Sequence, residues 1–203
     1  MAKKFQDKAD LRRPRGRRVE RSRVLIVTEG ECTEVQYFKN LCKHLRATGT
    51  NVMGVDVKGA GRDPSNVVNK AGKASQNGSL IGREGGYDAV WCVFDVDEHE
   101  KLEAATELAR KRGFKLAISN PCFEVWLLWH FEDCYKHLST DQAGKMLKKH
   151  GVLGKNMPEN FDYGNSRKAR SRAESALEDI PVNPGSRVWV LVDHLESGKR
   201  VGS

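Results

Sequence analysis

The sequence contains no apolar run long enough to cross a membrane, no CxxC pair and no secretion signal. Its longest strongly apolar stretches span about ten residues, whereas a membrane helix needs about 20. Residues 1–23 carry charge but lack the apolar segment of a secretory signal. We therefore expect a cytoplasmic protein with no membrane-embedded part.

Several frameworks for cofactors or covalent cross-links are missing as well. The five cysteines are odd in number and not closely paired, which argues against a disulfide framework or a zinc ribbon. Cys92 and Cys122 lie in apolar runs, so we expect them to be buried small hydrophobic residues. The loop "GAGRDP" at 59–64 lacks the lysine and the spacing of a P-loop.

Positive charge is abundant and unevenly placed. The net charge is +8, and seven arginines fall between Arg12 and Arg23 with almost nothing apolar among them. Such a segment predicts a flexible basic arm over residues 1–22. Further basic stretches lie at 145–155 and 166–172. Clusters of this kind attract nucleic acid, although they also serve as solubilising surfaces or bind acidic proteins. The residues expected to bind nucleic acid are Arg12, Arg13, Arg15, Arg17, Arg18, Lys148, Lys149, Arg167, Lys168 and Arg170.

Strand and helix patterns alternate over residues 23–131, which predicts an α/β domain with a compact parallel sheet flanked by helices. The expected strands are 23–28, 51–59, 87–97 and 114–119. Thr33 and Gln36 fit a capping box for the helix after the first strand. Asn120 and Pro121 are expected to begin a buried apolar helix that runs to Phe131.

The remaining residues, 132–203, are predicted to form a basic, helical C-terminal extension. The apolar positions Val188, Leu191, Val192 and Leu195 have the i, i+3, i+4, i+7 spacing of a helix. A strand over 187–192 is the alternative. The chain is thus divided into an arm (1–22), an α/β domain (23–131) and this extension.

Acidic residues follow the predicted strands, at the edge where parallel sheets bind ligands. Glu29 and Glu31 follow the first strand, Asp95 and Asp97 end the third, and Glu124 lies after the fourth. An extended backbone places Asp95 and Asp97 on the same side. Carboxylates are the ligands that Mg²⁺ prefers, and a cation relieves the repulsion between clustered acids. The sequence therefore favours a Mg²⁺ site, with Mn²⁺ as an alternative ion.

Each of these acids also has a plain structural interpretation. Glu29, beside Gly30, fits a solvated turn, and Glu124 fits the N-terminus of a helix, where any anion is stabilising. The acids at 97, 98 and 100 could serve the helix that follows them. His99 and Glu31 are candidates for proton transfer, and His99 also suits a softer ion such as Mn²⁺, although an exposed turn histidine is the favoured interpretation of His99.

Among the aromatic residues, the tryptophans 91, 126 and 129 lie in apolar runs and are expected in the core. Tyr163, between an aspartate and a glycine, is the better candidate to contact a substrate.

Three motifs together resemble the RloB-like proteins. They are "VLIVTEGECTEVQYF" at 24–38, "VFDVDEHE" at 93–100 and "ISNPCFEVWLLWHF" at 118–131. The segments "YGNSRKARSRAE" and "NPGSRVWVLVDHLES" resemble that family's helical extension. The resemblance thus covers nearly the whole chain after the arm.

The resemblance implies a Toprim-type fold. It implies that Glu29 takes part in acid–base work or metal binding and that Asp95 and Asp97 hold Mg²⁺. It also implies a nuclease effector in phage defence or restriction, acting on DNA or RNA with an ATPase partner. In such a mechanism the Mg²⁺ would stabilise the transition state at the scissile phosphate, and Glu29 would bind a second ion or deprotonate water.

Two other classes are consistent with parts of the sequence. The first is a noncatalytic module that binds nucleic acid or a partner through the basic face. The second is a phosphatase of the haloacid dehalogenase type, because "FDVD" resembles its Asp-x-Asp motif. That motif normally lies on the first strand and precedes a threonine-bearing turn, whereas here it lies on the third and precedes "EHE".

Overall fold

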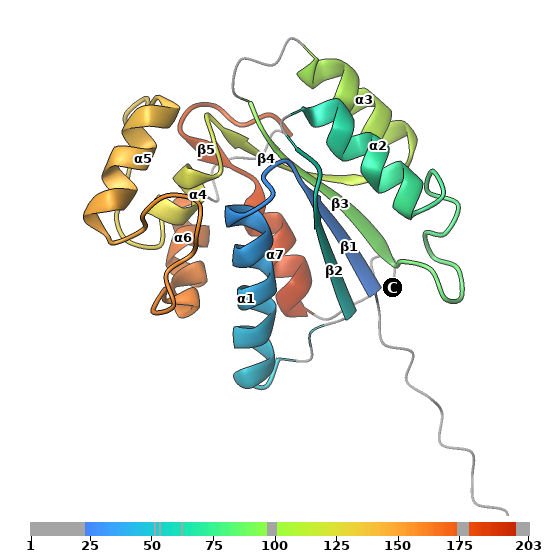
Figure 1. Cartoon of the computed structure of the whole chain (residues 1–203), viewed down its shortest axis with the longest axis horizontal. Helices are drawn as coiled ribbons and strands as arrows, with labels where there is room; N and C mark the ends of the chain where they lie inside the picture. Colours follow the sequence, from blue (N-terminus) through green and yellow to red (C-terminus); the bar gives the residue numbers. More distant parts are fainter. Residues whose placement is uncertain are drawn as a thin grey trace, which may run out of the picture.

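A five-stranded sheet flanked by helices organises the protein (Figure 1). The computed structural model describes residues 23–50, 52, 54–61, 63–96, 101–173 and 179–197. The strand order is β2-β1-β3-β4-β5, with the first four strands parallel and β5 antiparallel to β4. The strands are β1 (Arg23–Thr28), β2 (Gly54–Gly59), β3 (Ala89–Asp95), β4 (Lys115–Asn120) and β5 (Gly185–Ser186). The predicted α/β architecture is confirmed.

The helices lie on both faces of this sheet. They are α1 (Thr33–Ala47), α2 (Pro64–Ala74), α3 (Leu102–Lys111), α4 (Glu124–Leu128), α5 (Thr140–Lys149), the 3₁₀ turn η1 (Tyr163–Asn165), α6 (Ser166–Ala173) and α7 (Val188–Ser197). Helices α2 and α3 cover one face, and α1 and α7 cover the other (Figure 1). No helix in the described part of the chain is long and apolar enough to cross a membrane.

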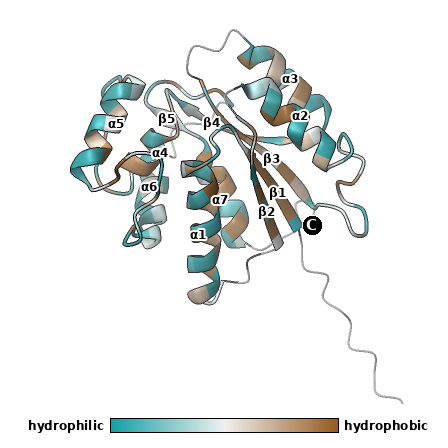
Figure 2. Cartoon of the chain, in the orientation of Figure 1, coloured by the Kyte–Doolittle hydropathy of each residue, from teal (hydrophilic) through white to brown (hydrophobic). Residues whose placement is uncertain are grey.

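The alternation of side chains along β1 explains why its sequence is apolar throughout. Val24 and Ile26 belong to the core under α1 and α7, whereas Leu25 and Val27 belong to the core under α2 and α3. A strand covered on both faces reads as a continuous hydrophobic run. The central strands are accordingly hydrophobic in Figure 2, and the outer surfaces of the helices are more hydrophilic.

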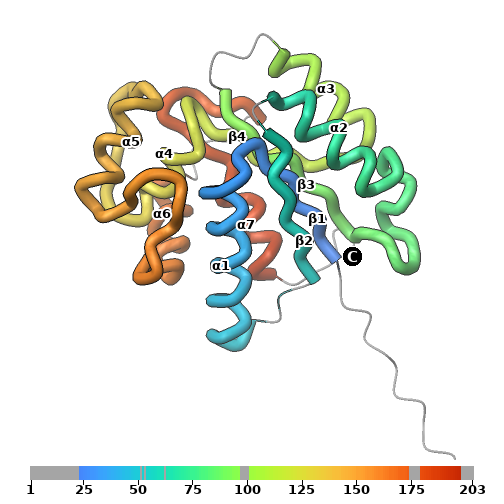
Figure 3. Tube along the Cα trace, in the orientation of Figure 1, coloured from blue at the N-terminus to red at the C-terminus, as the bar shows by residue number. Residues whose placement is uncertain are grey.

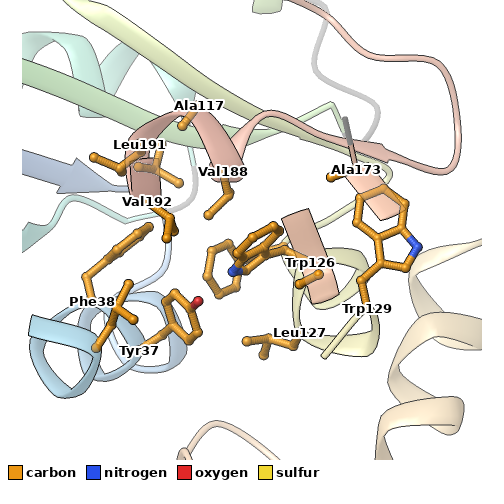
Figure 4. Packing of buried hydrophobic residues seen from close by; sticks show 14 of the residues in the cluster. Tyr37, Phe38, Ala117, Trp126, Leu127, Trp129, Ala173, Val188, Leu191 and Val192 are labelled. Carbon is orange, nitrogen blue, oxygen red and sulfur yellow. The ribbon is translucent and has the colours of Figure 1, made fainter. Parts of the chain in front are cut away.

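The larger core surrounds α4. Trp126 has no exposed surface, and its ring lies among residues from α1, α4 and α7 in Figure 4. Burying a large side chain of this kind contributes roughly 1.5–3 kcal/mol. Trp91 and Trp129 are also buried, at 2% and 3% exposure, so the prediction that the three tryptophans are core residues is confirmed. Cys92 and Cys122 are buried as predicted.

The start of α4 differs from the prediction. The helix begins at Glu124, not at Pro121, and Phe123 is its N-terminal flanking residue. Asn120 does not cap it: this residue ends β4, and its side-chain amide donates to the carbonyl of Pro181 at 2.8 Å. The asparagine is therefore engaged by a segment distant in sequence, which local capping rules do not anticipate.

The capping box predicted for α1 is also wrong. Cys32 precedes the helix, and no side chain caps it. Thr33 Oγ1 instead donates to the carbonyl of Lys155 at 3.1 Å, and the Gln36 side chain binds Asn156 and the amide of Met157. Both polar side chains thus anchor the loop after α5 to the start of α1.

The C-terminal part of the chain returns to the sheet (Figure 3). The predicted last helix is confirmed as α7, with Val188, Leu191, Val192 and Leu195 buried, and the alternative of a strand over 187–192 is wrong. A two-residue strand, β5, precedes it and was not predicted. The hydroxyl groups of Ser119 on β4 and Ser186 on β5 lie 2.9 Å apart in the buried junction.

Candidate metal site at the carboxyl edge of the sheet

The carboxyl ends of β1 and β3 lie side by side and bring two of the predicted acids together. The Glu29 backbone amide donates to the Val93 carbonyl at 2.9 Å, extending the β1–β3 ladder by one residue. The Asp95 backbone amide donates to Glu29 Oε2 at 3.2 Å. The acids predicted to follow the first and third strands thus lie at the ends of two adjacent strands.

A third acid, Glu34, joins this edge and was missed in the sequence. It lies in the first turn of α1 and has only 9% of its surface exposed. Its Oε1 accepts a hydrogen bond from the backbone amide of Gly30 at 2.8 Å. A Cβ atom on Gly30 would lie 1.8 Å from Glu34 Oε2, so the absent side chain of this glycine makes room for the carboxylate. The sequence signal that could have revealed this contact is a glycine at the end of the strand with a glutamate four residues later, in the first turn of the helix.

These carboxylates interact electrostatically. Burial is the main cause that holds the pKa of Asp95 well above its usual range, and the charges of Glu124, Glu34 and Glu29 raise it further. A backbone hydrogen bond from Phe123 opposes that shift. Burial likewise raises the pKa of Glu34, with smaller increases from Glu124 and Glu29. Asp95 and Glu34 are therefore harder to ionise, first because they are buried and second because other acids lie near them.

Glu124, at the start of α4, is the fourth acid near this edge and is partly buried. Cys122 lies beside it: burial raises the pKa of this thiol, and the charges of Glu124 and Asp95 add to the effect. The group is thus accompanied by a neutral thiol, not by a thiolate. We call Glu29, Glu34, Asp95 and Glu124 the carboxylate group.

The carboxylate group has the donor chemistry of a hard divalent cation. Mg²⁺ commonly takes one or two carboxylates and keeps several waters, and Glu29 and Asp95 can supply that number. Within the described ranges, no three His, Cys, Asp or Glu side chains converge closely enough to hold a metal ion as they stand. Asp97 and His99, predicted as metal ligand and proton-transfer residue, lie outside the described residues.

Glu31, the other candidate for proton transfer, is exposed at the rim of this edge. A Cβ atom on Gly59, at the end of β2, would lie 2.6 Å from the Glu31 Cα. The glycine lets the turn after β1 pass close to β2. Glu31 therefore has a fixed backbone position, with its side chain facing solvent.

The predicted nucleic-acid-binding residues occupy different elements. Lys148 and Lys149 are exposed at the end of α5, and Arg167 and Lys168 are exposed on α6. Arg170, also on α6, forms an ion pair with Asp193 at 3.1 Å and so helps to hold α6 against α7. The arginines of the predicted arm lie outside the described residues.

Tyr163, the expected candidate to contact a substrate, is buried in an aromatic cluster. It is 8% exposed, and its ring lies 5.0 Å from that of Phe161 and 5.7 Å from that of Tyr37. The same aromatic cluster contains His130, whose Nε2 lies 3.2 Å from the Tyr37 hydroxyl. These aromatic residues form the core that supports the carboxylate group.

Comparison with known proteins identifies the family. The family model described as RloB-like protein matches residues 24–195. The chain belongs to the RloB-like family. The match includes β1 to β4 and the C-terminal helices, and therefore every residue of the carboxylate group. No curated protein and no solved structure matches this RloB-like chain significantly.

Proposed function

We propose that this RloB-like protein is a metal-dependent nuclease that hydrolyses phosphodiester bonds of DNA or RNA. We further propose that it acts in the cytoplasm as an effector of anti-phage defence, together with an ATPase partner, and that its sheet is of the Toprim type. The observation that carries the proposal is the meeting of Glu29, Glu34, Asp95 and Glu124 at the carboxyl edge of the parallel strands.

The electrostatics of the carboxylate group support a cation there. Burial raises the pKa of Asp95 and the charges of the neighbouring glutamates raise it further, and a divalent cation would oppose that increase. Glu29 and Asp95, with Asp97 as predicted from the sequence, are the residues that would hold Mg²⁺ or Mn²⁺. A bound divalent ion supplies charge stabilisation to a phosphoryl transition state.

The protein's own side chains would supply orientation and proton transfer. Glu29 is held by its backbone bond to Val93 and by the Asp95 amide, and its carboxylate would either bind an ion or deprotonate a water molecule. Gly30 and Glu34 hold the turn between β1 and α1 in place. The exposed cations on α5 and α6 would bind the phosphate backbone with little base selectivity.

A noncatalytic module that binds nucleic acid or a protein partner is the second candidate. The exposed lysines of α5 and the arginine and lysine of α6 are the feature that favours it, because basic surfaces bind polyanions without any catalytic site. The two candidates differ in their dependence on metal, since simple electrostatic binding needs no divalent ion.

In the deciding experiment, the purified protein is incubated with plasmid, with single-stranded DNA or with tRNA. Each substrate is tested in the presence of Mg²⁺, Mn²⁺ or EDTA. We expect cleavage with a divalent ion and none with EDTA. Asp95→Asn should lose at least about a hundredfold in rate, as expected when a main electrostatic contact to the transition state is removed. Asp141→Asn, an exposed position on α5, is the matched control and should cleave normally. Metal-independent binding without cleavage would favour the noncatalytic module.

A further inference from the structure

A small cavity lies between α1, α4 and α5, and one member of the carboxylate group, Glu124, lines it. Its volume is about 130 Å³, and its lining includes Thr33, Glu124, Leu127, Gly144, Leu147 and Lys148. Glu124 and Leu127 are i and i+3 on α4, and Gly144, Leu147 and Lys148 are i, i+3 and i+4 on α5. Each set lies along one side of its helix. Each helix therefore contributes both a charged and an apolar side chain to the wall of the cavity.

We propose that this cavity binds a single-ring base, cytosine above all, of the nucleic-acid strand that the carboxylate group cleaves. This inference rests on the proposed nuclease function and adds to it a preference among substrates. In this proposal Glu124 contacts the base, and Glu29 and Asp95 are the residues that would hold a cation.

The size of the cavity selects one ring. A cavity of about 150 Å³ lined by aliphatic and aromatic side chains accommodates benzene. The present cavity, of about 130 Å³, is therefore filled by one ring, and a purine would leave part of its second ring outside. Leu127, Leu147 and Val152 make the inner wall of the cavity apolar, as is usual where a flat ring binds.

The polar groups of the wall select the edge of the base. The carboxylate of Glu124 can only accept hydrogen bonds when ionised. Thr33 Oγ1 donates its hydrogen to the Lys155 carbonyl, so its lone pairs remain as acceptors. A base edge that meets two acceptors must donate, and the exocyclic amine of cytosine does so, as in carboxylate contacts to this base.

The charge of Lys148 completes the arrangement. Lys148 is exposed where α5 borders the cavity, so its ammonium group can bind the phosphate attached to the enclosed base. Lys149 is equally exposed at the next position but does not line the cavity. The two lysines therefore form a matched pair for testing the site.

Gly144 allows the cavity to be filled with little disturbance. A Cβ atom at this position meets no atom within 4 Å, and the residue lies inside α5. A larger side chain there has space available and gains helix propensity over glycine. Gly144→Leu is thus the blocking variant, with Gly144→Ala as the small-change control and Lys145→Leu as a control that adds leucine at an exposed position of the same helix.

The experiment measures binding of fluorescent hexanucleotides of C, U and A, in ribo and deoxy forms, with Ca²⁺ as the divalent ion. We expect the C oligomer to bind the wild type on the order of tenfold more tightly than the A oligomer, a ratio that pocket contacts commonly supply. Gly144→Leu should abolish this preference, and both controls should keep it. Lys148→Ala should weaken binding of the C oligomer more than Lys149→Ala does.

The outcomes separate this inference from the nuclease proposal. A wild type that cleaves with metal but binds the C and A oligomers equally overturns the base site and leaves the nuclease intact. A wild type that prefers C without cleaving retains the base site and overturns the nuclease. If Gly144→Leu does not fold, the proposal is still tested by the preference of the wild type for C over A and by the comparison of Lys148→Ala with Lys149→Ala. A preference for C that survives in folded Gly144→Leu would place the selecting contacts elsewhere and overturn the proposal.

Discussion

The Asp95 backbone amide donates a hydrogen bond to the side chain of Glu29, which joins the ends of two neighbouring parallel strands. This hydrogen bond holds one carboxylate oxygen of Glu29, Oε2, against the backbone of β3. The position of this carboxylate is consequently set by the β1–β3 pairing, and it does not depend on a flexible loop.

Asp95→Asn should raise the melting temperature of the metal-free protein at pH 7 or leave it unchanged. The folded pKa of Asp95 is raised, so its contribution to stability is present at low pH and is lost as pH rises through that value. Asparagine removes the charge that causes the loss. Thermal scans in EDTA and in Mg²⁺ test this, and the wild type alone should gain stability with metal. A wild-type metal shift retained in the variant would exclude Asp95 as a ligand.

Gly30→Ala should displace the Glu34 side chain. The new methyl group would occupy the place of the Glu34 carboxylate, whose hydrogen bond to the Gly30 amide would break. We expect a loss of about 1–3 kcal/mol in the free energy of unfolding, measured with urea. Gly144→Ala, where the added methyl meets no atom, should be neutral or stabilising by up to about 1 kcal/mol. Equal effects of the two changes would show that the Glu34 contact is unimportant.

His130 should make the protein lose stability in mild acid. Its Nδ1 lies 3.0 Å from the Trp126 carbonyl, which can only accept, and its Nε2 lies 3.2 Å from the Tyr37 hydroxyl. Burial lowers its pKa to about 4, which means that its contribution is present above the unfolded value and is lost as pH falls toward 4.

The expected slope from His130 is about 1.4 kcal/mol per pH unit between roughly pH 6.5 and 4. Urea unfolding at pH 7.0, 5.5 and 4.5 measures it. His130→Gln should be less stable at pH 7 but should show a shallower pH dependence than the wild type. His137→Gln, at an exposed position, should retain the wild-type slope. An unchanged slope in His130→Gln would assign the acid sensitivity to other groups, such as His194.

Removing residues 1–22 should leave the melting temperature nearly unchanged and weaken nucleic-acid binding. The segment contains little that can pack, and its arginines would contact phosphates. Binding measured at several salt concentrations should give a shallower salt dependence for the truncated protein. Equal slopes for the two proteins would show that this segment serves another purpose.

The strands and the acids that follow them were predictable because both signals are local. An apolar run such as 90–94 is specified by neighbouring residues, and the parallel arrangement then places Asp95 beside Glu29. The burial of Glu34 was not predictable in this way, since it depends on how α1 turns back over Gly30. The cap expected at Asn120 failed for a related reason: its partner, Pro181, lies 61 residues away.

The two-residue strand β5 could not be predicted from the sequence either. It is too short to have a pattern of its own, and it exists because Gly185 and Ser186 find partners at the end of β4. Lys148 was predicted from charge alone, but its place beside Glu124 arises from the packing of α5 against α4. Such convergence between distant segments is a property of the tertiary structure.

The pairing of Ser119 with Ser186 joins positions 67 residues apart and has a consequence for synthesis on the ribosome. The edge that carries Glu29 and Asp95 can form once β3 has emerged, yet the part of the sheet face that α7 covers beside α1 stays exposed until residue 195 has been made. During that interval the nascent chain exposes aliphatic surface, which favours chaperone binding or aggregation. The rate at which the last third of the chain is translated should therefore govern how much of the protein reaches its native state.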